Sequence, residues 1–294
     1  MEQFSVLMSE HTSMKVGGPA RFFIEPASEA ELVEKVREFH GDGLPFFILG
    51  NGTNVIVRDR GYFGAVISTL KALTGISVSS GSGDAHKTAL YCGAGESLAR
   101  ISRVAAESGL TGLEELSGIP GSVGGAVYMN AGAYEREIAG VVLSVKAYDI
   151  VDDKIIMLTK DECMFGYRSS VFKKMPLVVL GAEFGLASGE REEIYAMMAD
   201  FAGKRNEKQP VELPSAGSFF KRPEGGYAGR LIEAAGLKGM RKGGAQVSEK
   251  HAGFIVNTGG ATASDVLNLA EEIKMIVYAK FRVELEEEPV IIGY

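Results

Sequence analysis

The fold is best inferred from the stretch Ser117-Gly118-Ile119-Pro120-Gly121-Ser122-Val123-Gly124-Gly125-Ala126, which continues through Val127-Tyr128-Met129-Asn130-Ala131-Gly132-Ala133. Residues 117–126 include four glycines and no charge. Because glycine leaves backbone amides uncovered and tolerates positive φ, such a run brings several N–H donors close to an anion or a flat ring. A flexible linker would be more polar. Taken alone, the segment is equally compatible with a tight buried turn between two elements.

A second glycine segment lies between two short apolar runs. Phe46–Leu49 is typical of a buried strand, Gly50-Asn51-Gly52-Thr53-Asn54 follows, and Val55–Val57 is apolar again. Amides and short polar side chains at a strand end suit a pyrophosphate, although Asn-Gly also favours a hairpin turn. The P-loop and dinucleotide-fold glycine motifs are both absent from the sequence, which disfavours a P-loop kinase and an ordinary Rossmann dehydrogenase.

The bulk composition is that of a globular protein of two or three compact units. The chain has 294 residues, 46% of them hydrophobic and 23% charged, and no window approaches the ~20 apolar residues of a membrane helix. Cys92 and Cys163 cannot form a disulfide framework, and no Cys/His spacing suits a metal. We therefore expect a cytoplasmic protein without metal or membrane contact, and the net charge of −7 argues against nucleic-acid binding.

Basic residues concentrate in the third quarter of this acidic chain. An acidic enzyme that acts on anionic substrates must gather its cations locally, although such a group is commonly an ordinary solvated surface. The residues concerned are Lys208, Lys221, Arg222, Arg230, Lys238, Arg241 and Lys242.

Local patterns predict mixed helix and strand. Ser28 to Glu31 has a capping-box pattern, and Ser97 is expected to cap a helix that ends at Gly109. Strands are expected at 89–92, 141–150, 154–159 and 177–186, an exposed turn at Gly81–Asp84, and a helix at 190–205 before an extended connector. In the last part we expect a short helix at 227–235, a strand at 252–257, and a long helix from Ser264 with the buried stripe Val266, Leu267, Ala270, Ile273 and Val277.

The two glycine segments resemble those of the UDP-N-acetylenolpyruvoylglucosamine reductase family, which catalyses the second committed step of peptidoglycan precursor synthesis. The matching residues are Leu49–Asn54 and Gly118–Ala133. The resemblance extends along almost the whole chain, and although each block alone is only modestly specific, their order is highly specific. The further blocks are His11-Thr12 with Val16–Ala20, Gly166–Phe172, Ala216–Lys221, Ala245–Gly253 and Leu285–Glu288.

The resemblance implies an α+β protein with a two-part FAD-binding fold of the vanillyl-alcohol-oxidase/PCMH type and a C-terminal α+β substrate-binding domain. The expected segments are residues 1–70 and 71–188 for FAD, 189–280 for substrate, and 281–294 as a C-terminal segment that carries a catalytic glutamate and returns to the FAD-binding region. FAD is expected to be noncovalent, since no histidine adjoins either glycine segment. The residues expected to hold it are Leu49, Gly50, Asn51, Gly52, Thr53, Asn54, Gly118, Ile119, Pro120, Gly121, Ser122, Gly124, Gly125 and Ala126.

The implied reaction reduces the enolpyruvyl ether of a UDP-sugar, with NADPH as the source of hydride. It serves cell-wall biogenesis, and thereby cell shape and division. Addition of hydride leaves negative charge next to a carboxylate, and this charge must be stabilised and then protonated on carbon. By motif position, Arg168 binds the carboxylate, Glu288 donates a hydrogen bond and Ser218 supplies the proton. The residues expected to bind the substrate are Tyr167, Lys208, Lys221 and Arg222.

The sequence departs from the family pattern at a few positions. Thr53 replaces the commoner serine, Arg282 replaces a usual glycine, and Pro289 follows Glu288 where valine is common. The family's lid-tyrosine insertion is absent from the sequence, which therefore resembles the shorter subclass, and we expect a monomer. The alternatives are another FAD-dependent oxidase or dehydrogenase of the same fold, or a non-catalytic flavin-binding relative.

Overall fold

The computed structural model describes residues 2–80 and 87–294. The expected turn at Gly81–Asp84 lies outside these ranges. The chain divides into two compact units: unit 1 is Met1–Gln3, Phe23–Asn51 and Gly64–Lys204, and unit 2 is Phe4–Phe22, Gly52–Phe63 and Arg205–Tyr294. Within the described ranges, none of the helices has the length and apolar character needed to span a bilayer.

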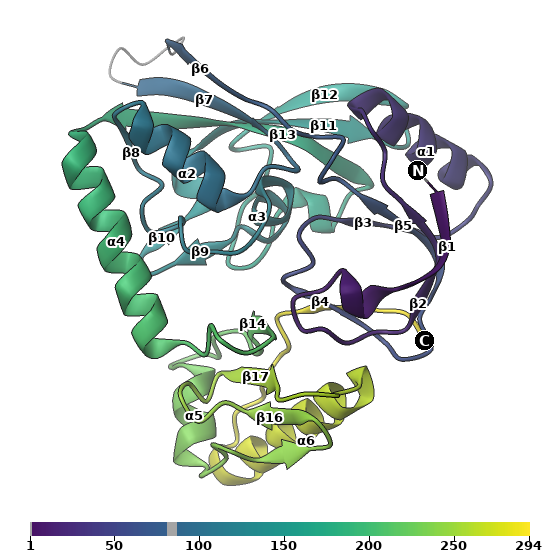
Figure 1. Ribbon diagram of the computed structural model, residues 1–294, viewed down its shortest axis with the longest axis vertical. Helices are drawn as coiled ribbons and strands as arrows, with labels where there is room; N and C mark the ends of the chain where they lie inside the picture. The colour runs from purple at the N-terminus through teal and green to yellow at the C-terminus, as the bar shows by residue number, and fades with distance from the viewer. Residues whose placement is uncertain (1, 81–86) are drawn as a thin grey trace. The chain divides into compact units, whose positions relative to one another are not determined.

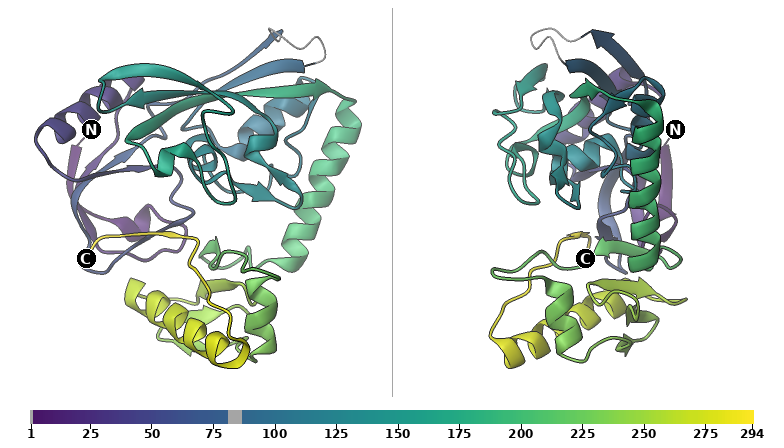
Figure 2. Two further views of the ribbon diagram at one scale, coloured as in Figure 1. Left: turned by 180° about the vertical axis from the view of Figure 1, so that it is seen from behind. Right: turned by 90° about the vertical axis from the view of Figure 1, so that its left-hand side faces the viewer.

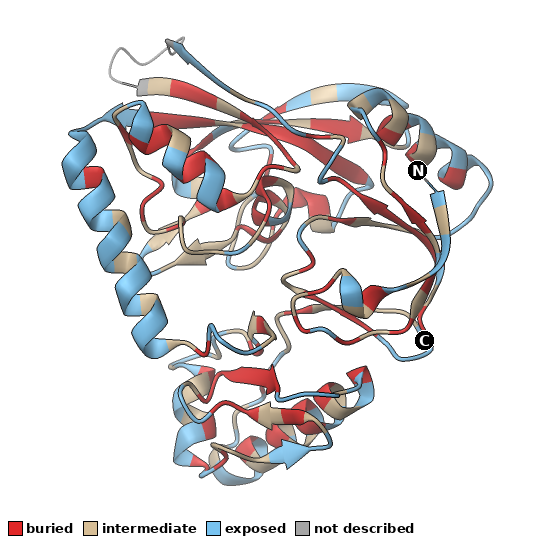
Figure 3. Cartoon of the chain, viewed as in Figure 1, coloured by how far each residue is buried: buried red, intermediate tan, exposed pale blue. Residues whose placement is uncertain are grey.

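Unit 1 is built around an antiparallel sheet with the strand order β12-β11-β13-β7-β6, and β8 also pairs with β13 (Figure 1). Its central strand β13 is buried along most of its length (Figure 3). A strand buried on both faces reads as a continuous apolar run, which explains why the run at 177–186 was recognisable from sequence. The strands are β6 (Ile76–Ser80), β7 (Lys87–Gly93), β8 (Leu110–Thr111), β11 (Val142–Asp149), β12 (Lys154–Thr159) and β13 (Leu177–Ser188).

Three capped helices accompany this sheet in unit 1. Helix α3 (Val123–Met129) packs against β7 and β13, as Figures 1 and 2 show from opposite sides. Helix α2 (Leu98–Glu107) begins at Ser97, whose hydroxyl accepts from the Arg100 amide at 3.2 Å as predicted. Helix α1 (Glu29–Gly41) forms only half of the expected capping box. Ser28 accepts from the Glu31 amide, but the Glu31 carboxylate accepts from the Ala27 amide.

The strands around the second glycine segment do not form a hairpin. Strand β3 (Phe46–Leu49) pairs in parallel with β5 (Tyr62–Ser68), in a sheet of order β1-β2-β5-β3 with β1 (Glu2–Leu7) and β2 (Pro19–Ile24). Strand β4 (Val55–Val57) pairs in parallel with β18 (Val290–Ile292). The hairpin alternative is therefore wrong, because the two flanking strands belong to different sheets.

Helix α4 (Arg191–Lys208) extends three residues beyond the expected end at Arg205. Ile194 is its single buried residue, and the rest of the helix is largely exposed (Figure 3). A helix that is polar around most of its circumference takes little stability from a core, and the ion pair between Lys204 and Asp200, four residues apart, supports it locally.

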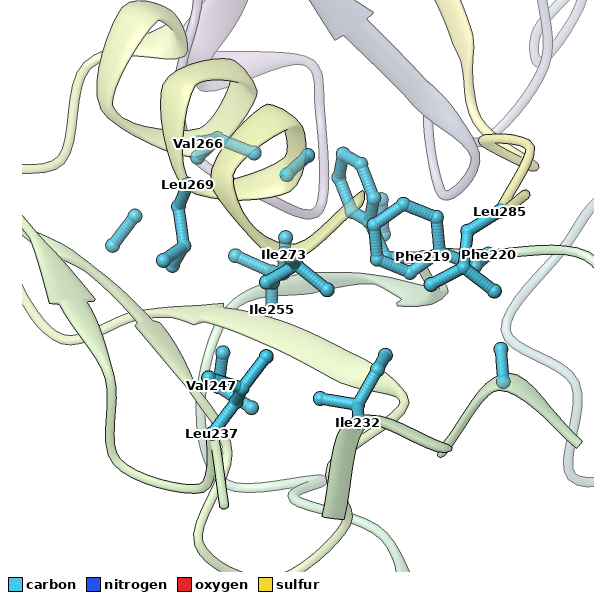
Figure 4. Packing of buried hydrophobic residues seen from close by; sticks show 14 of the residues in the cluster. Phe219, Phe220, Ile232, Leu237, Val247, Ile255, Val266, Leu269, Ile273 and Leu285 are labelled. Atoms are coloured by element: carbon cyan, nitrogen blue, oxygen red, sulfur yellow. The ribbon is translucent and has the colours of Figure 1, made fainter. Parts of the chain in front are cut away.

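The C-terminal part of unit 2 contains a four-stranded antiparallel sheet and two helices around one core. The sheet has the order β14-β17-β16-β15, and α6 (Ala263–Phe281) packs on β15, β16 and β17. Figure 4 shows Val266, Leu269 and Ile273 of α6 facing Val247 and Ile255. The other elements are α5 (Ala228–Ala234), β14 (Ser215–Ser218), β15 (Arg241–Lys242), β16 (Ala245–Val247) and β17 (Phe254–Asn257).

The buried stripe of α6 differs from the expected one at a single position. Leu269 is fully buried, whereas Leu267 is only partly buried and packs at the edge of the core. The other four expected residues are buried. The helix ends at Arg282 with φ of +59°, the left-handed position at which glycine is the usual C-cap residue. This explains structurally why a glycine is typical at residue 282.

The start of α6 is capped twice. Thr262 and Asp265 form a reciprocal capping box, and the carboxylate of Asp59 accepts from the amides of Ala263 at 2.7 Å and Ser264 at 2.9 Å. The loop after β4 therefore supplies an acceptor to a helix that begins about two hundred residues later in the sequence.

We expect Asp59→Ala to lower the free energy of unfolding by about 1–2 kcal/mol, because two helix-terminal amides lose their acceptor. Urea unfolding followed by circular dichroism measures the change. Asp42→Ala is the matched control, since Asp42 is an exposed carboxylate that follows α1. Equal midpoints for the two variants would show that the Asp59 cap contributes nothing.

Candidate functional site

The two glycine segments come together in unit 1, as the sequence predicted. The side-chain amide of Asn51 donates to the Pro120 carbonyl at 2.6 Å. Gly50 lies so close to Ser122 that a Cβ built on it would be 2.2 Å from the Ser122 hydroxyl oxygen. Only glycine permits this approach. Residues 50–51 and 120–122 are thus neighbours although they are far apart in the sequence.

This junction presents backbone donors that find no acceptor in the described part of the chain. The amides of Val123 and Gly124 donate to the carbonyls of Glu96 and Ala94, each at 2.8 Å, and Gly125 donates to the Ser122 hydroxyl at 3.3 Å. Five neighbouring amides donate to no acceptor among residues 2–80 and 87–294: those of Gly50, Asn51, Gly118, Gly121 and Ser122. Clustered open amides of this kind fit a pyrophosphate, so these residues suit the diphosphate of FAD.

Arg168 lies at the tip of a tight turn in the same unit. Gly166 and Ser169 exchange two backbone hydrogen bonds, at 3.0 and 3.1 Å, which leaves Tyr167 and Arg168 at the tip. The base of the turn is fixed to the C-terminal end of α3, since Asn130 donates to the Gly166 carbonyl at 2.9 Å. Through α3, the turn is tied to the glycine segment that precedes the helix.

The Arg168 backbone is in an unfavourable conformation. Its φ is +50°, which costs a non-glycine residue about 1–2 kcal/mol. The half-buried guanidinium lies over the Tyr167 ring at 5.2 Å, and its Nη2 donates to the Gly132 carbonyl at 3.4 Å. Residues in sparsely populated backbone regions cluster at functional sites, which favours a functional reason for this arginine.

Ser218 and Glu288 are brought close in unit 2. The amide of Glu288 donates to the carbonyl of Phe219 at 2.9 Å, and Lys221 donates to the Glu286 carbonyl at 2.9 Å. The exposed Ser218 ends β14, while Phe219 is buried in the core of the unit (Figure 4). A serine on a strand end that is anchored by a buried aromatic neighbour has little freedom to move.

The three consecutive glutamates are distinguished by their surroundings. Glu286 forms an ion pair with Lys221, and Glu287 forms one with Lys274 at 2.9 Å. Glu288 is the glutamate whose amide bonds to the residue after Ser218, and its side chain is half-buried. The backbone hydrogen bond to Phe219 therefore favours Glu288 over Glu286 as the glutamate that acts together with Ser218.

The end of the second glycine segment also belongs to unit 2. The Asn54 side chain donates to the Glu288 carbonyl at 3.3 Å, and the Val290 amide donates to the Asn54 carbonyl at 2.9 Å. Gly52, with φ of +64°, contacts the N-terminal block: its carbonyl accepts from the Ser13 amide at 3.0 Å. A Cβ on Gly52 would lie 2.1 Å from the His11 carbonyl oxygen. The role of the His11-Thr12 block as support for this segment was not foreseen.

Three lysines of the basic cluster form ion pairs with glutamates. Lys238 pairs with Glu233 at 2.7 Å, and Lys242 pairs with Glu272 at 2.9 Å, as Lys221 does with Glu286. These three lysines therefore do not form the open positive surface that their number suggests.

Of the other cations expected to bind substrate, Arg222 lies over the Tyr227 ring at 4.4 Å, with Arg230 over the same ring at 5.0 Å. Lys208, in the last turn of α4, is exposed and forms no ion pair with any described residue.

The cysteines are unsuited to a covalent role. Both are fully buried, and burial raises the pKa of Cys92 to about 12 and that of Cys163 to about 11. A thiol in that range is protonated at neutral pH and is a poor nucleophile. Among the described residues, no group of three or more His, Cys, Asp or Glu side chains could hold a metal ion.

Comparisons with known proteins, which together cover nearly the whole chain, point to one family. A family model described as UDP-N-acetylenolpyruvoylglucosamine reductase, C-terminal domain, matches residues 209–292, and an FAD binding domain model matches residues 20–158. A UDP-N-acetylenolpyruvoylglucosamine reductase of Caldanaerobacter subterraneus subsp. tengcongensis is 47% identical over 286 residues, which cover 97% of this chain and 92% of that protein. A reductase of the same name from Clostridium botulinum (strain Langeland) is also 47% identical, over 97% and 90% of the two chains.

One solved structure covers 100% of both chains. It is the UDP-N-acetylenolpyruvylglucosamine reductase of Thermus caldophilus, which superposes with a TM-score of 0.79 at 34% sequence identity.

Proposed function

This chain belongs to the UDP-N-acetylenolpyruvoylglucosamine reductase family, and on that premise we propose that it reduces UDP-N-acetylglucosamine enolpyruvate to UDP-N-acetylmuramate. NADPH is the reductant and FAD is bound noncovalently. The reaction belongs to peptidoglycan precursor synthesis, and we place it in the cytoplasm with the enzyme acting as a monomer. The observation that carries the proposal is the junction of residues 50–51 with 120–122 and its unused amides.

FAD fits this chain through backbone donors and not through a covalent bond. The open amides around Gly50 and Gly121 would hold its diphosphate, and both cysteines are buried and protonated. When bound, FAD supplies hydride transfer from NADPH to the substrate.

Stabilisation of the developing charge falls to Arg168 and Glu288. Hydride added to the terminal methylene of the enolpyruvyl group leaves negative charge on the adjacent carbon, which is conjugated with a carboxylate. The planar guanidinium of Arg168 matches that carboxylate, and a protonated Glu288 donates a second hydrogen bond. Within its own unit each group has a fixed backbone, because Arg168 is held by its turn and Glu288 by its bond to Phe219.

Ser218 completes the reaction by protonating carbon. A serine hydroxyl is a weak acid, but it is always protonated at neutral pH and its acceptor here is a strong base. Its hydroxyl is exposed at the end of β14, which leaves it accessible to substrate. Tyr167, Lys208, Lys221 and Arg222 bind the UDP-sugar. Lys221 forms an ion pair with Glu286, whereas Lys208 forms none with the described residues.

We expect the purified protein to be yellow, and acid precipitation should release the colour into solution. Catalytic turnover of NADPH, beyond the single equivalent that reduces the bound FAD, should require UDP-N-acetylglucosamine enolpyruvate. Colour that stays with the precipitate would identify a covalent flavoprotein of the oxidase kind. A yellow protein that consumes no NADPH with this substrate would be a non-catalytic flavin binder.

A further inference from the structure

A histidine outside the proposed catalytic set lies at one end of a hydrogen-bond series that leads to Ser218 and Glu288. The Gly253 amide donates to Nδ1 of His251 at 3.0 Å. The Gly253 carbonyl accepts from the Phe219 amide at 2.8 Å, and the Phe219 carbonyl accepts from the Glu288 amide at 2.9 Å. His251 thereby holds one side of Gly253, and the carbonyl on the other side of Gly253 binds the residue next to Ser218.

The imidazole is held firmly in this role. The His251 amide donates to the Ser248 hydroxyl at 3.3 Å, and the ring packs edge-on against Phe254 at 5.1 Å between centroids. On the other side, Gly229 of α5 approaches so closely that an added Cβ would lie 3.2 Å from His251 Cε1. Nδ1 can accept this hydrogen bond only when it carries no proton, so the contact requires a neutral ring with its proton on Nε2.

We propose that His251 is a positioning residue of the proposed reaction: its Nδ1 holds the amide of Gly253, and the carbonyl of the same residue binds Phe219 and so helps to set the places of Ser218 and Glu288. The inference rests on the proposed function for its kinetic consequence, whereas the hydrogen-bond series stands on geometry alone. His251 reaches the chemistry only through the backbone. The substrate half-reaction should depend on it, and the NADPH half-reaction should not.

Protonation of His251 should make its hydrogen bond with Gly253 sensitive to pH. Burial lowers the pKa of His251 below its usual value of 6.5. A hydrogen bond with the backbone of His251 itself opposes this lowering of the pKa, the charge of Lys238 lowers the pKa further, and the charge of Glu233 of α5 raises it. Lys250 and Glu249 adjoin it in its own turn. As pH falls below 6.5 and through the lowered pKa, Nδ1 gains a proton and can no longer accept from Gly253.

Two substitutions of His251 test whether the hydrogen-bond acceptor or the bulk of the side chain matters. His251→Leu fills much of the space without an acceptor, whereas His251→Asn offers an amide oxygen near the Nδ1 position. We expect His251→Leu to slow the substrate half-reaction at least tenfold, and His251→Asn to stay within about threefold of wild type. Flavin content and the NADPH half-reaction should be unchanged in both. His40→Gln, at an exposed histidine of α1, is the matched control.

Amide hydrogen exchange supplies a readout that does not depend on catalysis. Exchange at Gly253 and Phe219 should rise about five- to tenfold in His251→Leu, but not in His251→Asn. In wild type the rate of the substrate half-reaction should decrease as pH falls below 6.5. This decrease, the acidic limb of the pH–rate profile, should be absent in His251→Asn.

Three results would overturn the proposal: equal rates in His251→Leu and His40→Gln, loss of flavin or of the NADPH half-reaction in His251→Leu, or persistence of the acidic limb in His251→Asn. Failure of the proposed function is a separate result, because wild type itself would then not consume NADPH with the UDP-sugar.

Discussion

Replacing Ser218 with alanine is expected to slow the substrate half-reaction by about 10²- to 10⁴-fold, the usual contribution of a positioned general acid. FAD content and the half-reaction with NADPH should stay close to wild type, because the hydroxyl is needed only after hydride has reached the substrate. Stopped-flow absorbance of the flavin, first with NADPH and then with the UDP-sugar, measures the two steps separately.

Ser215→Ala is the matched control for this variant. Ser215 begins the same strand, pairs with Val256 and is half-exposed, so its replacement tests the effect of losing a hydroxyl from β14. The strand itself should survive both changes, since Phe219 and Phe220 stay in the core. A Ser218→Ala protein that loses flavin, or that is slow with NADPH alone, would make the serine structural and would contradict the proposed proton transfer.

The family and the fold class were accessible from sequence because their signals are local. Glycines at 50, 118 and 121 were identified by their spacing and by the absence of charge, and the comparisons confirm the predicted family, with an FAD-binding part and a C-terminal domain of the reductase kind. Helix starts at Ser28 and Ser97 were also predicted, since a cap depends on the next three residues.

Features that depend on distant partners could not be read from local patterns. The parallel pairing of β4 with β18 joins residues 55–57 to 290–292, so the Asn-Gly dipeptide between β3 and β4 suggested a hairpin that does not exist. The Asp59 cap on α6 is another such contact. The helical period predicted where the buried stripe of α6 lies but not its exact margin. Leu267 was predicted to be buried, whereas Leu269 is the buried residue.

Contacts between distant residues also limited what the sequence could predict about the proposed site. The sequence shows how many basic residues there are, but not that Lys242 is paired with Glu272, thirty residues later in the chain. Motif order selected Arg168, Ser218 and Glu288, and their catalytic roles stay predictions. The division of the chain into segments ending at 70, 188 and 280 also stays a prediction. The contact-based units are discontinuous in sequence, because residues 4–22 and 52–63 belong with the C-terminal part.

The left-handed conformation of Arg168 leads to the second large effect. Arg168→Gly should slow the substrate half-reaction by about 10²- to 10³-fold, since a charged donor to the developing negative charge is lost. Its free energy of unfolding should nevertheless stay within about 1 kcal/mol of wild type, because glycine adopts φ of +50° without strain and this offsets the lost contact with Tyr167.

Arg168→Lys distinguishes charge from geometry. Lysine keeps the positive charge but lacks the planar fork, and it keeps the backbone strain, so this variant should be slow with the UDP-sugar and no more stable than wild type. Urea unfolding and single-turnover kinetics with the UDP-sugar test both variants. Full activity in Arg168→Lys would show that a point charge suffices. A large loss of stability in Arg168→Gly would mean that the side chain is retained to hold the turn and not to bind the substrate carboxylate. If both expectations hold, the strain at residue 168 is tolerated because an arginine at this turn is needed to bind the substrate carboxylate.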